Sequence, residues 1–66
     1  MNESKEAIIA VLYDNGIGNG ITEYERGKSI FRKIIMEEYD QGVYSASYTW
    51  YVYDMVLKTI AEYCQV

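Results

Sequence analysis

The sequence of 66 residues contains no histidine, no proline and only one cysteine. Without histidine, the chain lacks the usual base of Ser-His and Cys-His catalysis and the commonest metal ligand in proteins. A single cysteine excludes an internal disulfide and any cysteine-rich zinc site. We therefore expect no enzymatic activity, no cofactor and no metal ion.

Basic residues are also scarce, since six lysines and arginines stand against ten acidic residues and leave a net charge of −4. An acidic chain is a poor ligand for the phosphate backbone of nucleic acids. Four of the six bases do lie close together, at Arg26, Lys28, Arg32 and Lys33. Acidic residues flank this basic cluster and cancel most of its field. A nucleic-acid partner is therefore not expected, and a transcriptional regulator with a helix-turn-helix-like core is the alternative hypothesis.

Long apolar runs are absent too. The first apolar run, residues 7–13, is far shorter than the roughly 18 residues that a membrane-spanning helix needs. The first residues lack the basic region of a secretory signal. We expect no membrane partner and a cytoplasmic location, which would be the host cytoplasm for a viral protein.

Half of the residues are hydrophobic and 24% are charged, a composition typical of a folded protein. A chain of this length forms one domain at most, here residues 1–66. Glycines divide it into three segments. The first predicts a helix over about 3–14, which Asn2 or Ser4 can cap and Gly16 can end.

The second segment predicts a helix over about 23–40. Thr22 and Glu25 have the spacing of an N-terminal capping box, and Gly42 can end the helix. Apolar residues and a glycine recur on one face of this segment every three or four residues, at Tyr24, Gly27, Ile30, Phe31, Ile34 and Ile35.

The third segment predicts a helix over about 48–64, with Ser47 as a possible cap. Residues 43–53 also show the alternation of a β-strand. No second strand is available to pair with it, so we favour the helix. The fold prediction is a compact all-α domain of three helices.

The third helix carries two apolar seams. Large, rigid residues form the first seam, which suits a core: Trp50, Tyr53, Leu57, Ile60 and Cys64. The second seam and a neighbouring tyrosine are richer in the residue types that recur at interfaces. We therefore predict a protein interface at Tyr48, Tyr51, Val52, Met55, Thr59 and Tyr63.

An exposed second seam predicts association, as a homodimer, a higher homo-oligomer or a complex with another protein. Met55→Glu is expected to abolish this association while the chain stays helical. The alternative is a central third helix that the other two helices clasp on both sides.

Residues 14–25 resemble an EF-hand calcium loop at Asp14, Ile21, Thr22 and Glu25. Gly16 and Gly18 stand where such a loop needs side-chain oxygens, so we expect no calcium binding. Cys64 has no neighbouring cation to activate its thiol and is expected to be an apolar filler.

These features favour a small acidic protein-binding module that docks on a macromolecular partner and modulates or inhibits it. Short, acidic, tyrosine-rich proteins without a cofactor are often inhibitors. By analogy, this includes the proteins that phages direct against host or defence enzymes.

Overall fold

The computed structural model describes all 66 residues and contains three helices and no strand. The helices are α1 (Lys5–Asp14), α2 (Ile21–Asp40) and α3 (Ala46–Cys64). The predicted all-α three-helix domain is therefore confirmed. Residues 46–53, which also showed the alternation of a β-strand, are helical. Each helix begins and ends within two residues of its predicted boundary.

Serine side chains cap the N-termini of two of the helices. The Ala7 N–H donates to Ser4 Oγ at 3.2 Å at the start of α1. The Tyr48 N–H donates to Ser45 Oγ at 3.2 Å at the start of α3. The cap of α3 is therefore Ser45 and not Ser47, because the helix begins two residues earlier than predicted.

The start of α2 differs from the predicted capping box. Its N-cap is Gly20, with no side-chain cap, so Thr22 already lies inside the helix. The Glu25 carboxylate forms an ion pair with Lys28 at 3.0 Å instead of capping the helix. Gly20 has a φ of 107° and donates its N–H to the Cys64 carbonyl at 2.9 Å, which ties the loop before α2 to the end of α3.

Glycine ends α1 and α2, as predicted. Gly16 and Gly42 have positive φ angles of 68° and 77°, which a residue without Cβ adopts most readily. In each case the following N–H donates to a carbonyl inside the helix: Ile17 to Leu12 at 3.0 Å, and Val43 to Glu38 at 2.9 Å.

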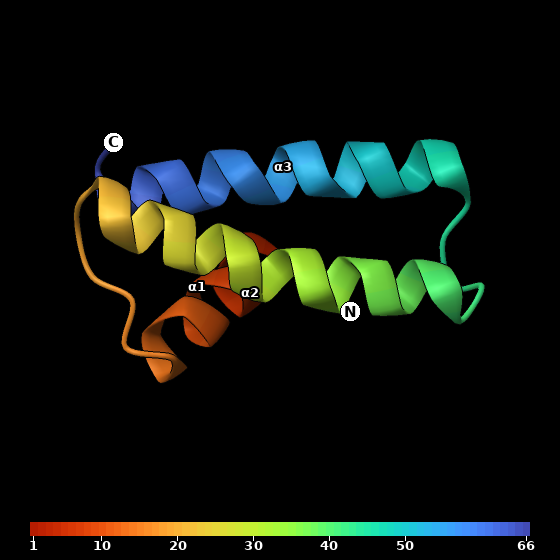
Figure 1. Ribbon diagram of the computed structural model, residues 1–66, viewed down its shortest axis with the longest axis horizontal. Coiled ribbons are helices and arrows are strands. Elements are labelled where there is room, and N and C mark those ends of the chain that lie inside the picture. Colours follow the sequence, from red (N-terminus) through yellow and green to blue (C-terminus); the bar gives the residue numbers. More distant parts are fainter.

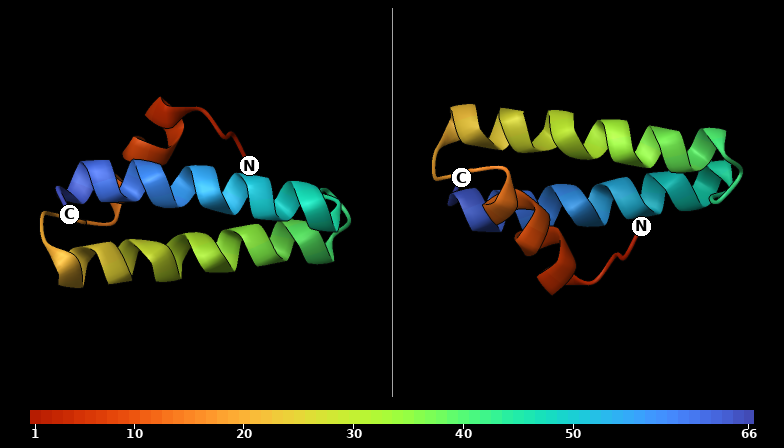
Figure 2. Two further views of the ribbon diagram at one scale, coloured as in Figure 1. Left: turned by 90° about the horizontal axis from the view of Figure 1, so that it is seen from above. Right: turned by 90° about the horizontal axis from the view of Figure 1, so that it is seen from below.

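The antiparallel helices α2 and α3 lie side by side (Figure 1). Helix α1 and residues 1–4 lie on one side of this pair, whereas no main chain covers the opposite side (Figure 2). The molecule is 32 Å long. A helix of ten residues such as α1 spans only about 15 Å. It therefore covers about half of the pair, and residues 1–4 continue along the rest.

The core lies where the three helices meet, and it contains Ile8, Leu12, Ile17, Phe31, Ile35, Tyr44, Val52, Val56, Ile60 and Cys64. Gly27 of α2 is buried and faces both α1 and α3. A Cβ atom added to it would lie 3.0 Å from Ile60 of α3 and 3.1 Å from Leu12 of α1. The absence of a side chain at this position therefore allows α1 to pack across both longer helices.

Candidate functional site

The predicted interface residues do not form one free surface. Val52 and Thr59 are buried within the chain, and Met55 and Tyr63 are partly buried against the core. Only Tyr48 and Tyr51 are exposed.

The neighbouring parts of the same chain explain this burial. Lys5 of α1 forms an ion pair with Glu62 of α3 at 2.6 Å, and Tyr48 donates a hydrogen bond to Glu3 at 2.5 Å. These contacts place α1 and the N-terminal segment over the second seam. Val52 and Thr59 are therefore buried by contacts within the chain, as expected for the alternative in which α3 is the central helix, although the side of α3 that carries Trp50 stays open.

The first seam was assigned to the core, which would require all of its residues to be buried. Not all of them are. Ile60 and Cys64 are buried and Leu57 is partly buried, but 72% of Trp50 is exposed. The assignment of Trp50 to the core is therefore wrong. The reason is that α1, the one further helix, packs on one side of the α2–α3 pair and leaves the opposite side uncovered.

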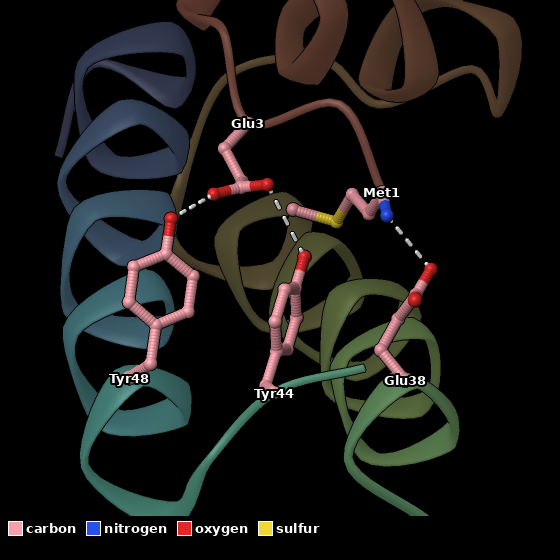
Figure 3. A network of polar contacts seen from close by, with 5 residues as sticks. All are labelled: Met1, Glu3, Glu38, Tyr44 and Tyr48. Carbon is pink, nitrogen blue, oxygen red and sulfur yellow. Dashed lines mark hydrogen bonds and ion pairs between the residues drawn. The ribbon is translucent and has the colours of Figure 1, made fainter. Parts of the chain in front are cut away.

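Residues 1–4 are held by a network of polar contacts around Glu3 (Figure 3). The Glu3 carboxylate accepts hydrogen bonds from the hydroxyl groups of Tyr48, at 2.5 Å, and Tyr44, at 3.4 Å. The amino group of Met1 forms an ion pair with Glu38 at 2.8 Å. The N-terminal segment is thereby bound both to α2 and to the region where α3 begins.

The same network changes the acidity of its tyrosines. Burial, with the nearby charges of Glu3 and Glu38, raises the pKa of Tyr44 to about 12. The hydrogen bond to Glu3 raises the pKa of Tyr48 above its ordinary value. Both hydroxyl groups are therefore protonated donors at neutral pH, and the network is structural in character.

The uncovered side of the α2–α3 pair contains a groove with a volume of about 440 Å³. It is lined by Arg32, Ile35, Met36, Thr49, Trp50 and Tyr53. A second hollow of about 220 Å³ shares Met36, Thr49 and Trp50 with it and extends to Tyr39 and Ala46. The two hollows form one apolar depression, which we call the α2–α3 groove.

One free cation lies at this groove. The chain has ion pairs between Lys5 and Glu62, Arg26 and Glu23, Lys28 and Glu25, and Lys58 and Asp54. The two remaining bases, Arg32 and Lys33, have no carboxylate partner. The Arg32 guanidinium donates only to the hydroxyl of Tyr53, at 3.3 Å, and so remains available to a ligand in the groove.

The basic cluster considered for nucleic-acid binding is half neutralised. Arg26 is 2.7 Å from Glu23, and Lys28 is 3.0 Å from Glu25. Of the four bases, two thus remain without an acidic partner, and one of these lines the apolar groove. No strip of free cations is available to follow a phosphate backbone.

The loop that resembles a calcium site uses its acidic groups within the protein. Glu23 accepts hydrogen bonds from the Gly18 N–H at 2.9 Å and from Arg26, while Glu25 pairs with Lys28. Accordingly, the pKa of Glu23 is lowered, mainly by Arg26 and then by Gly18. No group of three or more Cys, Asp or Glu side chains lies close enough together to hold a metal ion.

The single thiol, that of Cys64, does not have the surroundings of a reactive cysteine. Cys64 is fully buried at the end of α3. Burial, with a smaller contribution from the charge of Glu23, raises the pKa of its thiol. A nucleophilic cysteine requires the opposite, a lowered pKa and access to substrate.

In comparisons with known protein families, with curated proteins and with solved structures, the chain has no match. None of its helices combines the length and the apolar character that crossing a membrane demands.

Sequence reasoning missed the groove because it treated each helix separately. Met36 and Tyr39 lie beside the main apolar face of α2 and are 46% and 41% exposed. With Trp50 they surround the smaller hollow. The available signal is the number of helical segments, because one further helix can cover only one side of two paired helices.

Proposed function

We propose that this chain is a small acidic protein-binding module that docks on a macromolecular partner and modulates or inhibits it. The α2–α3 groove is its contact surface. The observation that supports this proposal is Trp50, which is 72% exposed at the wall of an apolar hollow. Tryptophan, tyrosine and arginine are the residue types that most often dominate the energetics of protein interfaces, and all three line this groove.

The proposal extends to the setting in which the module acts. A cytoplasmic location agrees with the free thiol of Cys64, since cytosolic proteins keep their thiols reduced. Inhibition of a host or defence enzyme by a phage protein is the specific form that the small size and the acidic composition favour. Partner binding requires no catalytic group, and the chemistry of the groove, apolar with one cation, suits contact with protein.

Site-specific photo-crosslinking tests the surface. A photoreactive phenylalanine analogue replaces Met36 in the groove or, as a matched control, Tyr13, which is 75% exposed on α1. In a native lysate, we expect the label at position 36, and not at position 13, to capture one discrete protein. That protein is then purified, and its affinity and activity are measured with wild type and with Trp50→Ala.

The expected result is that Trp50→Ala lowers the affinity at least about 30-fold, as for a central interface residue. Equal labelling from both positions, or equal binding by the Trp50→Ala variant, would contradict the proposal.

A further inference from the structure

The groove and a side chain that can fill it belong to the same surface. Trp50 of α3 is 72% exposed and is one of the residues that line the hollow. A surface that carries both a projection and a matching hollow can pair with a copy of itself about a two-fold axis, since each copy supplies what the other lacks.

We propose that a second copy of this chain covers the α2–α3 groove in the free protein, in a two-fold dimer that exchanges Trp50 between the copies. This inference rests on the function proposed above, because it takes the groove to be a protein-contact surface. A target protein that uses the groove then competes with the second copy.

The antiparallel arrangement of α2 and α3 determines the geometry of this dimer. A two-fold axis parallel to the helices places α2 of one copy against α3 of the other, and every neighbouring pair is antiparallel, as in a four-helix bundle. A rotation about this axis leaves positions along the helices unchanged. A residue of α2 therefore has the same residues of α3 beside it in the partner as in its own chain. Trp50 of one copy thus lies against Met36 and Arg32 of the other.

These contacts have suitable chemistry. The indole ring attracts the Arg32 guanidinium through its π face and packs favourably against the thioether of Met36. Arg32 has no carboxylate partner within its own chain, so no ion pair must be broken to form the contact.

The charges on this face are complementary as well. The hydrogen bond between Arg32 and Tyr53 shows that these residues lie at one level, and Asp54 follows at the same level. Asp54 also lies one helical turn after Trp50 and is exposed. The dimer therefore brings Arg32 of each copy near Asp54 of the other. Asp54 already pairs with Lys58 of its own chain, but this ion pair is exposed and contributes little to stability.

The excess of acidic groups lies away from this contact. Glu6 and Asp14 belong to α1, and Glu3 and Glu62 face the side on which α1 and residues 1–4 lie. These four acidic groups therefore lie on the outer sides of the dimer and oppose association only weakly.

Sedimentation equilibrium from low micromolar to sub-millimolar concentration tests the dimer. We expect wild type to dimerise and Trp50→Ala to raise the dissociation constant at least about 30-fold. Arg32→Asp and Asp54→Arg each bring like charges together and raise it roughly tenfold. The double variant, Arg32→Asp with Asp54→Arg, restores it to within about threefold of wild type. Tyr13→Ala on α1 is the matched control and leaves it unchanged.

Three results would overturn the dimer: wild type that remains monomeric, Trp50→Ala that dimerises as strongly as wild type, or a double variant no tighter than its single variants. Circular dichroism of each variant shows whether it is folded. A monomeric wild type that still crosslinks another protein through position 36 overturns the dimer and leaves the docking function intact. A dimer that crosslinks only itself supports this inference and counts against the docking function.

Discussion

Gly27 shows how one residue controls the packing of all three helices. It lies in the middle of α2, where glycine costs about 1 kcal/mol of helix stability relative to alanine. In return, glycine allows close packing between the helices, because Leu12 of α1 and Ile60 of α3 both approach the space that a side chain would occupy.

Gly27→Ala should therefore destabilise the protein by about 1 kcal/mol in urea unfolding. Crowding a packed core costs roughly 1–3 kcal/mol, which outweighs the gain in helix propensity. Leu12 and Ile60 have no exposed surface, so neither can move aside freely. Ser29→Ala on the exposed side of α2 is the control and should change stability by less than about 0.5 kcal/mol. A Gly27→Ala variant more stable than wild type would show that the helices separate without cost.

Tyr44 makes the stability depend on alkaline pH. Its pKa is raised from 10.0 to about 12 in the folded chain, mainly by burial. Between these pH values the unfolded chain releases a proton that the folded chain retains, so stability falls as pH rises through that window. Tyr44→Phe should remove this part of the fall. Urea midpoints of wild type and variant, measured from neutral pH to pH 12, provide the comparison.

The pKa values of Lys5 and Lys28 are also raised, so these residues too make the folded state less stable as pH rises. Their contribution is the same in wild type and in Tyr44→Phe. Parallel curves for wild type and Tyr44→Phe would therefore exclude Tyr44 as a source of the pH dependence.

At the scale of the elements, α3 is the central helix, and its two sides have different roles. One side contains Met55, which packs against the core, whereas the other contains Trp50, which is exposed. Met55, which the sequence predicted as a contact for another molecule, is thus partly buried, and Trp50, which it predicted as a core residue, is exposed.

Met55→Glu should accordingly lower the stability of the chain by about 1–3 kcal/mol, since it places a charge at a half-buried apolar position. Trp50→Glu should change the stability of the monomer by less than about 0.5 kcal/mol and abolish association. Thermal melts at concentrations too low for dimerisation, with sedimentation at higher ones, separate the two effects. The reverse pattern would restore the original assignment of the two seams.

The loop between α1 and α2 offers few side-chain ligands for a cation. Gly16 and Gly18 provide no side-chain oxygen, and Glu25 is engaged with Lys28. Millimolar calcium should therefore leave the melting temperature unchanged, with magnesium at equal ionic strength as the control. A rise of several degrees with calcium alone would identify a site, because a ligand that binds only the folded state must stabilise it.

At the scale of the whole molecule, charge decides between the two classes of macromolecular partner. The net charge is −4, and the basic cluster on α2 is half neutralised by neighbouring acids. We expect negligible binding to duplex DNA at physiological salt in a fluorescence anisotropy titration. A basic DNA-binding domain of similar size is the positive control. Submicromolar, sequence-dependent binding would instead favour the regulator with a helix-turn-helix-like core.

The sequence by itself determined the three helices and most of their ends. The apolar periodicity of α2, the Ser4 cap and the stops at Gly16 and Gly42 depend on residues within a few positions of one another, so local patterns predict them. All three helices start two residues from their predicted positions, and at α2 and α3 the cap was also assigned to the wrong one of two suitable residues. At α2, a tertiary hydrogen bond from Gly20 to Cys64 accompanies the true start.

Only the tertiary structure decided which side of α3 is covered and which is open. Both seams are apolar enough to be buried, so their composition could not distinguish them. The choice depends on contacts between distant residues: the close approach at Gly27, the ion pair between Lys5 and Glu62, and the hydrogen bonds of Glu3 to Tyr44 and Tyr48. Because α1 packs on one side of the α2–α3 pair only, these contacts also determine that the groove at Trp50 remains open.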